Sequence, residues 1–133
     1  MTQNIKVRSR SRTELIDITG DVNRCIEKSG ISRGICTIYV PHTTAAVTIN
    51  ENADPSVKKD ILSVLEKLIP AVADYKHAEG NSDAHVKAGL MGANKTVIIE
   101  NGSLKLGRWQ GIFFCEFDGP RAREAWITLM AEV

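Results

Sequence analysis

The chain has 133 residues, which fits one domain of ordinary size and is too short for two full hydrophobic cores. Hydrophobic residues make up 43% and charged residues 25%, and no apolar run approaches the roughly 20 residues of a membrane span, which argues against disorder and membrane insertion. The 17 Lys and Arg residues nearly balance the 16 Asp and Glu residues, so a net charge of +1 supplies no long-range attraction for nucleic acid or an anionic membrane.

The start of the chain, MTQNIKVRSRSR, carries basic residues but neither the apolar segment nor the small-residue cleavage site of a secretory signal. We therefore expect a cytoplasmic protein. Cys25, Cys36 and Cys115 are odd in number and form no C-x-x-C motif, so they are expected to be small apolar fillers rather than disulfides or nucleophiles.

The first half of the chain predicts three strands around one helix. Residues 4–9 alternate weakly, as in a half-exposed strand. The helix runs from Thr19 to about Ser29 and stops at Gly30. Residues 35–40 form a continuous apolar run that is typical of a buried strand, and residues 45–50 follow as its hairpin or crossover partner.

The second half opens with the clearest helix, in which Asp54 is the N-cap and Pro55 occupies the first helical position. This helix ends before Pro70. The remaining predicted elements are a short helix over 84–91 capped by Ser82 or Asp83, a hairpin over 96–106 around Asn101-Gly102, and strands at 111–117 and 126–133. Strands outnumber helices and interleave with them irregularly, which predicts an α+β fold with a mostly antiparallel sheet and about three helices.

The three histidines, His42, His77 and His85, each lie in a polar stretch just outside an apolar element. In HAEGNSDAH, two imidazoles are eight residues apart, and the polar residues between them can bind the second ring nitrogens. These polar residues are Glu79, Asn81 and Asp83. If a helix begins here, the positive end of its dipole disfavours the imidazolium form of His85, and a neutral imidazole is the form that binds a metal. The pattern therefore indicates a metal site with three imidazoles and an open fourth position, or else a polar cluster that binds an anion or only stabilises a loop.

A second polar set brackets the apolar strand at 111–117. Gln110 and Glu116 share a face of a regular strand but lie about 20 Å apart, at roughly 3.3 Å per residue, and so cannot bind the same atom. Glu116 is flanked by two phenylalanines, which predicts a raised pKa suited to a general acid or base. The alternative is an ion pair with Arg121 or Arg123. Arg121 follows a Gly-Pro turn and is well placed to bind phosphate.

The basic residues Lys6, Arg8, Arg10 and Arg12 alternate near the N-terminus and predict a charged stripe along one strand face. An exposed edge strand protected by charge explains this stripe more simply than contact with nucleic acid, because no stacking aromatic residues accompany it. A further polar stretch at 50–54 ends in Asp54, for which the capping role is favoured over catalysis.

Three extended motifs, PHTTAAVTINENAD, HAEGNSDAHVKAGLMG and LGRWQGIFFCEFDGPR, closely resemble the YjbQ-like family, called secondary thiamine-phosphate synthase. The resemblance covers nearly the whole chain. It implies a compact α+β sandwich that assembles as a trimer, with polar pockets near the subunit contacts and a weak ability to make thiamine phosphate. The histidine motifs associated with a metal or anion site in that family match His42, His77 and His85. Arg108 stands where the family often has a small residue.

Together these observations predict a single YjbQ-like domain over 1–133 that acts as a homotrimeric, metal-assisted enzyme on a small phosphorylated metabolite. The predicted metal ligands are His42, His77 and His85, with zinc favoured over magnesium and manganese. The predicted catalytic residues are Glu79, Asp83 and Glu116. The predicted substrate-binding residues are Thr43, Thr44, Asn50, Asn81, Gln110 and Arg121. The alternatives are a metal-assisted hydrolase or transferase for another phosphorylated metabolite and a non-catalytic protein that binds a small ligand, with a nucleic-acid-binding module ranked last.

Overall fold

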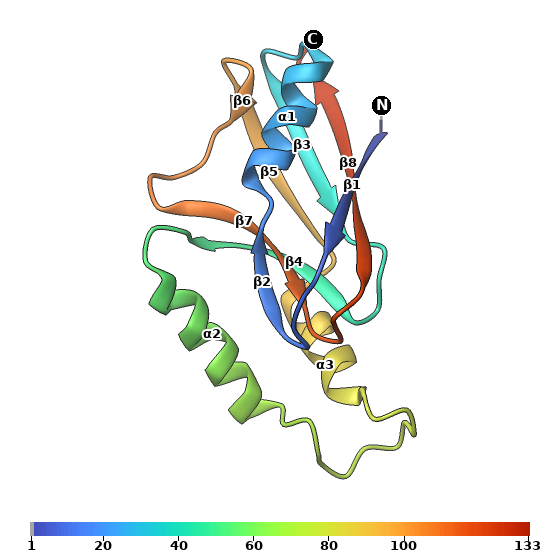
Figure 1. The fold of residues 1–133 in the computed structure, drawn as a ribbon. Helices are drawn as coiled ribbons and strands as arrows, with labels where there is room; N and C mark the ends of the chain where they lie inside the picture. Colours follow the sequence, from blue (N-terminus) through green and yellow to red (C-terminus); the bar gives the residue numbers. More distant parts are fainter. Residues whose placement is uncertain (1) are drawn as a thin grey trace.

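A computed structural model describes residues 2–133 as eight strands and three helices (Figure 1). The strands are β1 (Thr2–Arg8), β2 (Glu14–Asp17), β3 (Gly34–Tyr39), β4 (Ala45–Glu51), β5 (Asn94–Glu100), β6 (Ser103–Leu104), β7 (Gln110–Glu116) and β8 (Ala122–Ala131). The helices are α1 (Thr19–Ser29), α2 (Pro55–Leu68) and α3 (Ser82–Met91). Within residues 2–133, none of these helices has the length and apolar character that a bilayer crossing needs.

The strands form two antiparallel sheets, one with five strands in the order β1-β8-β3-β5-β6 and one with three in the order β2-β7-β4. This arrangement confirms the predicted α+β fold with three helices. The expectation that 35–40 and 45–50 form a pair of strands is wrong, because β3 pairs with β5 and β8 whereas β4 pairs with β7 in the other sheet. The turn between β3 and β4 therefore carries the chain from one sheet to the other.

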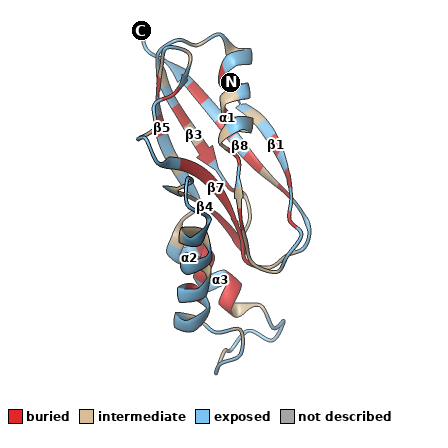
Figure 2. Ribbon diagram, turned by 60° about the vertical axis from the view of Figure 1, so that its left-hand side comes forward, coloured by how far each residue is buried: buried red, intermediate tan, exposed pale blue. Residues whose placement is uncertain are grey.

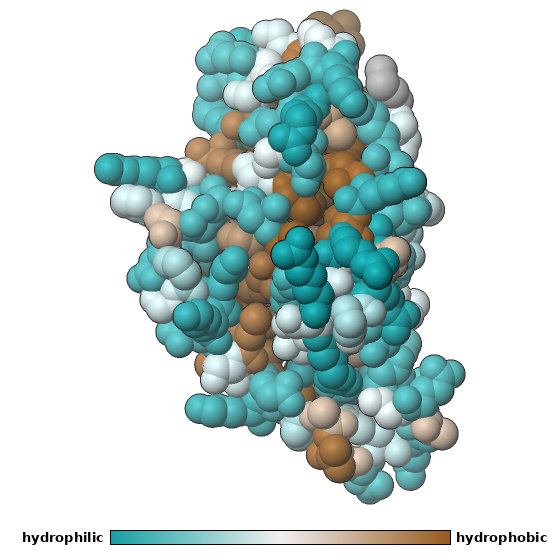
Figure 3. Space-filling view, viewed as in Figure 1, coloured by the Kyte–Doolittle hydropathy of each residue, from teal (hydrophilic) through white to brown (hydrophobic). Residues whose placement is uncertain are grey.

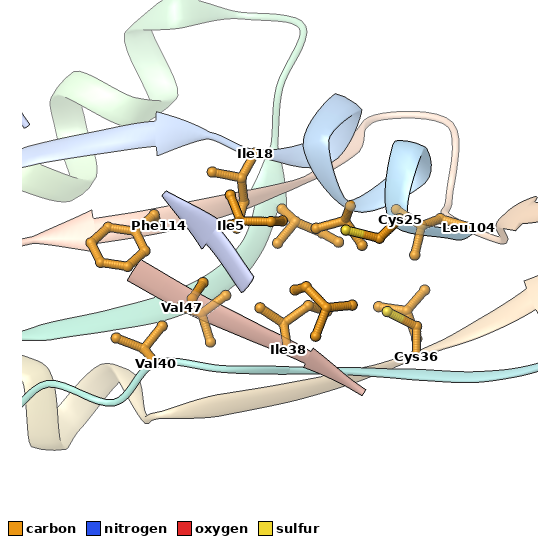
Figure 4. Close-up of a cluster of buried hydrophobic side chains, with 14 of the residues drawn as sticks. Ile5, Ile18, Cys25, Cys36, Ile38, Val40, Val47, Leu104 and Phe114 are labelled. Carbon is orange, nitrogen blue, oxygen red and sulfur yellow. The ribbon is translucent and has the colours of Figure 1, made fainter. Parts of the chain in front are cut away.

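The first hydrophobic core lies between the two sheets and α1. Figure 4 shows side chains from the five-stranded sheet, such as Ile5 and Ile38, facing Cys25 of α1 and Val47 and Phe114 of the three-stranded sheet. Burial raises the pKa of the Cys36 thiol in this core to about 12. Cys115, which lies in the second core on the other face of the three-stranded sheet, has its pKa raised to about 12 for the same reason. All three cysteines are buried and free, as expected.

The second core lies on the opposite face of the three-stranded sheet, where α2 and α3 pack. The central strand β7 is buried on both sides and stands out in Figure 2. Ile112 and Phe114 point into the first core, and Phe113 and Cys115 point into the second. This position explains the unbroken apolar run at 111–117, since each face of β7 needs its own apolar side chains.

The structure confirms the helix ends and the hairpin turn that short sequence motifs predicted. Asp54 caps α2 by accepting a hydrogen bond from the backbone N–H of Ser56 at 2.9 Å. Gly30 ends α1 with φ of 74°, and Asn101 and Gly102 turn the β5–β6 hairpin with φ of 54° and 76°. These are the left-handed conformations that Gly and Asn adopt most readily.

Three elements differ from what the sequence predicts: one strand that was not predicted, the start of one helix and the start of the last strand. The strand β2 was not predicted, because its four residues are too few to show a period. The helix α3 begins at Ser82 after Asn81, and neither Ser82 nor Asp83 caps it. The last strand, β8, begins at Ala122 rather than 126, since its first residues pair with Lys6, Val7 and Arg8 of β1.

Glycine at position 34 is required by a close backbone contact, which gives a stability prediction. A Cβ at Gly34 would lie 2.0 Å from the backbone oxygen of Met130 on the neighbouring strand. We expect Gly34→Ala to lower the free energy of unfolding by about 2 kcal/mol or more in urea denaturation. A Cβ at Gly89 in α3 meets nothing within 4 Å, so Gly89→Ala is the control and should raise stability by about 0.5–1 kcal/mol. Equal stabilities of the two variants would contradict this packing.

Candidate functional site

Polar side chains gather where the β1–β2 connection, the β7–β8 turn and the loop before α3 meet, at the α3 end of the molecule (Figure 1). Arg12 donates two hydrogen bonds of 2.9 Å to the carboxylate of Asp83. Asn81 Nδ2 donates to Asp118 Oδ2 at 2.9 Å. We call this region the α3 cluster; it consists of Arg12, His77, Glu79, Asn81, Asp83, His85, Asp118 and Arg121.

Two of the three histidines form a pair in this cluster. The ring centroids of His77 and His85 are 5.3 Å apart, and the ring planes meet at 81°. His77 Nε2 lies 3.7 Å from Glu79 Oε2. His85 occupies the first turn of α3, where its backbone N–H donates to the carbonyl of Asn81 at 3.3 Å. The structure therefore brings together two predicted metal ligands and one predicted catalytic carboxylate.

His42 lies apart from this pair, against β8. Its Nε2 accepts a hydrogen bond of 3.1 Å from the backbone N–H of Glu124. Burial, followed by the nearby charge of Arg123, lowers the pKa of His42 below its ordinary value of 6.5. The imidazole is therefore neutral at pH 7, and because Nε2 is the acceptor, Nδ1 carries the proton.

The predicted metal site with three imidazoles does not form within one chain. Among residues 2–133, no group of three or more His, Cys, Asp or Glu side chains is placed to hold a metal ion. The Nε2 lone pair of His42 is occupied by a backbone N–H, so ligation through that atom would break an existing hydrogen bond. Two imidazoles and a carboxylate are suitable zinc donors chemically, but the residues of one chain do not fit the ion. A site shared between two copies stays a prediction.

Glu116 forms a buried ion pair with Arg123, and the two side chains are 0% and 4% exposed. Arg123 Nη2 lies 2.5 Å from Glu116 Oε2, and Nε lies 2.9 Å from Oε1. Burial alone would raise the pKa of this carboxyl group. Hydrogen bonds from Arg123, from the Ser9 hydroxyl and from the backbone N–H of Asp118 outweigh burial, so the pKa of Glu116 lies below its ordinary value. The predicted raised pKa is wrong, and the alternative ion pair with Arg123 is confirmed.

The threonines of the PHTT motif differ in their surroundings. Thr44 is buried, and its Oγ1 accepts a hydrogen bond of 2.8 Å from Arg123 Nη2. Thr43 is exposed. Thr44 therefore supports the buried ion pair rather than lying open to a substrate, whereas Thr43 is free to contact one.

Asp83 is fully buried and anchors α3. The hydrogen bonds from Arg12, which outweigh the opposite effect of burial, lower the pKa of Asp83 and keep its carboxylate charged. Lys87, whose side chain is 1% exposed, lies 3.4 Å from Asp83 Oδ2 and 2.8 Å from Glu66 Oε2 on α2. This chain of alternating charges favours an anchoring role for Asp83 over the predicted catalytic role.

The predicted basic stripe is interrupted. Lys6 and Arg8 lie on β1, but β1 ends at Arg8. The backbone N–H of Arg10 donates to the Glu14 carboxylate, and Arg12 turns toward α3. The four residues therefore do not share one strand face, because the chain leaves the sheet between the second and the third.

The guanidinium group of Arg121, which was predicted to bind phosphate, is partly engaged in hydrogen bonds and partly exposed. Its Nε donates to the carbonyl of Asp118 at 2.9 Å and its Nη2 to the Asp118 carboxylate at 3.1 Å, while the side chain remains 49% exposed. Asn81 binds the same carboxylate, and its Oδ1 is buried without a hydrogen-bond partner among residues 2–133. A buried oxygen of this kind costs free energy that a donor from a ligand or a second subunit would recover.

Asn50 and Gln110 lie at the other end of the three-stranded sheet from the α3 cluster. The regular β4–β7 register places Asn50 opposite Gly111, whereas Glu116 pairs with Ala45 at the opposite end. Both side chains are exposed and bind nearby backbone: Gln110 Oε1 accepts from the N–H of Gly107 at 2.7 Å, and Asn50 Oδ1 from that of Glu51 at 2.7 Å. The separation of Gln110 from Glu116 agrees with the sequence analysis, and neither residue joins the cluster.

Lys87 and Ser9 were not identified from the sequence as members of this network of charges and hydrogen bonds. Lys87 follows Asp83 by four residues, a spacing that places both on one helix face with Ala84 and Ala88, which are also buried. That pattern would have indicated a buried ion pair. Ser9 gives no comparable local signal, because its partners Glu116 and Arg121 are more than 100 residues away.

The buried ion pair predicts acid sensitivity. Because the pKa of folded Glu116 lies below its ordinary value of 4.5, the folded chain binds fewer protons than the unfolded chain as the pH falls through that value. The stabilisation is therefore present at neutral pH and is lost in acid. Glu116→Gln should lower the free energy of unfolding by about 3–5 kcal/mol at neutral pH, because Arg123 loses its partner charge, and by less in acid.

Urea denaturation at neutral and acid pH measures both variants and wild type. The control is Glu132→Gln, which removes an exposed ion pair with Arg33 and should change stability by less than about 1 kcal/mol at either pH. A Glu116→Gln deficit that is equally large in acid would contradict the assigned charge state.

Sequence comparison identifies relatives over nearly the whole chain. The family model described as UPF0047 protein YjbQ-like matches residues 3–132. A UPF0047 protein of Methanocaldococcus jannaschii is 52% identical over 127 residues, which cover 96% of this chain and 92% of that protein. YugU of Bacillus subtilis, also a UPF0047 protein, is 49% identical over 131 residues, which cover 98% and 99% of the two chains.

Solved structures show the same fold. The crystal structure of a YjbQ/UPF0047 family protein from Clostridium acetobutylicum superposes with a TM-score of 0.94 at 52% identity and covers 96% of this chain and 99% of that one. A protein from Sulfolobus solfataricus superposes with a TM-score of 0.94 at 36% identity, with coverage of 99% and 97%. The family match, the relatives and the shared fold agree, and the chain belongs to the YjbQ-like UPF0047 family.

Proposed function

We propose that this chain is a subunit of a homo-oligomeric enzyme that acts on a small phosphorylated metabolite at the α3 cluster, with thiamine phosphate formation as a secondary reaction. The observation that carries the proposal is the His77–His85 pair, with Glu79 beside it. Contacts through Asn81 and Asp118 connect this pair to the half-exposed guanidinium of Arg121. Groups that transfer protons and a group that binds phosphate therefore share one surface.

The chemistry of thiamine phosphate formation matches these groups. A carbon–nitrogen bond forms between the pyrimidine methylene carbon and the thiazole nitrogen, and the bond from that carbon to diphosphate breaks, so pyrophosphate leaves. Arg121 would stabilise the negative charge on the leaving group. The His77–His85 pair would donate a proton to the departing pyrophosphate, with Glu79 orienting the His77 ring. A hydrolase or transferase for another phosphorylated metabolite would use the same groups.

The oligomer is proposed from the outer face of the five-stranded sheet. Large apolar side chains are exposed there, namely Ile35, Tyr39, Ile98, Trp126 and Met130. They adjoin one another, because Ile35 is paired with both Ile98 and Met130, and the rings of Tyr39 and Trp126 stack at 5.8 Å. By contrast, the face of the molecule seen in Figure 3 is mostly hydrophilic, with apolar side chains in a narrow strip. Contiguous exposed apolar surface is typical of a subunit contact.

The predicted trimer is tested by measuring the molecular mass of the protein in solution. Light scattering during size-exclusion chromatography should give three times the 14.6 kDa of one chain for wild type. Ile98→Asp should shift the mass to that of one chain, because a charge would be buried at the contact. Val64→Asp, at an exposed apolar position on α2, is the control and should leave the mass unchanged. A wild-type protein with the mass of one chain would contradict the trimer.

The catalytic role of the histidine pair is tested by turnover. We expect His85→Ala to lower the rate of thiamine phosphate formation from the pyrimidine diphosphate and the thiazole phosphate about 100-fold, the usual contribution of a proton-transferring group. Val86→Ala, at the neighbouring exposed position of α3, is the control and should keep the wild-type rate. Both are followed by pyrophosphate release. Substrate binding without turnover in wild type would favour the non-catalytic alternative.

A further inference from the structure

A cavity on the outer side of β1 and β8 is separate from the α3 cluster. Its volume is about 440 Å³, within the range of small-molecule sites. Its lining residues are Lys6, Val7, Arg8, His42, Ala122, Arg123 and Glu124. None of them belongs to the α3 cluster.

The strand register explains why cationic side chains line this cavity. In the antiparallel pair of β1 and β8, Lys6 lies opposite Glu124, and Arg8 lies opposite Ala122. Residues two apart on a strand, and residues directly opposite, point to the same face. The small side chain of Ala122 leaves space beside Arg8, so the cavity lies next to the Arg8 side chain.

The cavity carries an excess of positive charge, because its lining includes the cations Lys6, Arg8 and Arg123 and one carboxylate, Glu124, which lies opposite Lys6. The ion pairs within residues 2–133 include neither Lys6 nor Arg8. The Glu124 carboxylate is held by other donors, with Trp126 Nε1 at 2.6 Å and Asn4 Nδ2 at 3.4 Å. Arg123 is neutralised by Glu116. The two unpaired cations of β1 therefore remain available for an anionic ligand.

His42 contributes a donor rather than an acceptor to this cavity. Its Nε2 is occupied by the backbone N–H of Glu124, so the proton of the neutral ring lies on Nδ1. An imidazole N–H from a residue that lines the same cavity as two cationic side chains suits phosphate oxygens, which accept several hydrogen bonds at once. A metal ion is disfavoured here, because Glu124 is the one carboxylate among the lining residues and it lies beside two cationic side chains.

We propose that the β1–β8 cavity binds the phosphate or diphosphate group of a small metabolite, through Lys6, Arg8 and the Nδ1–H of His42. This binding site goes beyond the proposed function, since it does not depend on the histidine pair or on turnover. It also assigns His42 a role in anion binding in place of metal ligation.

The experiment measures the affinity of the whole protein for inorganic pyrophosphate by isothermal titration calorimetry. The double variant Lys6→Gln/Arg8→Gln should bind at least about tenfold more weakly than wild type, because two charge-assisted contacts are lost. The matched control is Lys59→Gln/Lys67→Gln on α2, which removes the same charge from two exposed positions and should bind within about twofold of wild type. Ala122→Glu, which places a carboxylate opposite Arg8, should likewise weaken binding at least about tenfold.

A second measurement locates the ligand. Pyrophosphate should shift the nuclear magnetic resonance signals of the Glu124 amide and the His42 ring, and these shifts should disappear in the Lys6→Gln/Arg8→Gln variant. Wild type that binds no pyrophosphate, or equal losses in the double variant and its control, would overturn the proposal. Loss of binding in Arg121→Gln alone would move the anion site to the α3 cluster, which overturns this inference and leaves the proposed function standing. Binding of single-stranded RNA through Lys6 and Arg8, but not of pyrophosphate, would overturn it in favour of a nucleic-acid surface.

Discussion

The buried ion pair of Arg123 and Glu116 is the interaction on which the geometry of the functional end depends. It joins β8 to β7, and its outer hydrogen bonds reach Thr44 before β4 and Ser9 after β1. Such a pair adds little net stability, because the desolvation of both charges offsets their attraction. Its loss is costly because one charge would be left buried alone. The pair therefore selects one arrangement of four chain segments rather than supplying the main stabilisation, which comes from the two hydrophobic cores.

A second set of ion pairs, among Arg12, Glu66, Asp83 and Lys87, links the helices α2 and α3 to each other and to the β1–β2 connection. Most of α2 is exposed, and Leu65 is the one residue of this helix that is buried. The contact of Glu66 with Lys87 connects α2 to α3 in addition to their packing in the second core, and Asp83 in turn connects α3 to Arg12. The loop that carries His77 lies between these two helices, and His85 follows in the first turn of α3. The contacts of Glu66 with Lys87 and of Asp83 with Arg12 therefore lie near the two ends of this loop, and the contacts of His77 with Glu79 and His85 lie within it and at its end.

Elements with local signals could be predicted from the sequence, and elements defined by distant partners could not. Asp54-Pro55 and Asn101-Gly102 determine backbone geometry within a few residues, so the start of α2 and the β5–β6 turn were found. The strand β2 exists through its pairing with β7, almost 100 residues later, and four residues carry no visible period. The same distinction applies to β3 and β4, which were expected to pair with each other but belong to different sheets. Two successive apolar strands have the same sequence pattern whether they join one sheet or two.

The candidate site shows this limit at single residues. Glu116 could be assigned a charged partner, but the choice between Arg121 and Arg123 needs the face of β8. Arg123 shares its alternating face with Ala125, Ile127 and Leu129, all buried, so the period of two already indicates that Arg123 points inward. Arg121 precedes the strand and stays exposed. Sequence pattern can therefore decide the orientation of a charged side chain once the strand is known to begin at Ala122.

The histidines could not be placed by any such pattern, since spacing along the chain does not report which sheet a preceding strand joins. His42 follows β3, which pairs with β8, and this pairing brings the imidazole to the Glu124 N–H. His77 and His85 are joined by a loop and the first turn of α3, so their pairing is local. Three similar residues thus occupy two chemically different surroundings. One imidazole is fixed as a neutral donor beside unpaired cations, and the other two are exposed beside a carboxylate. The buried Arg123–Glu116 pair lies between these surroundings, because its arginine lines the β1–β8 cavity and its glutamate accepts a hydrogen bond from the Asp118 N–H of the α3 cluster.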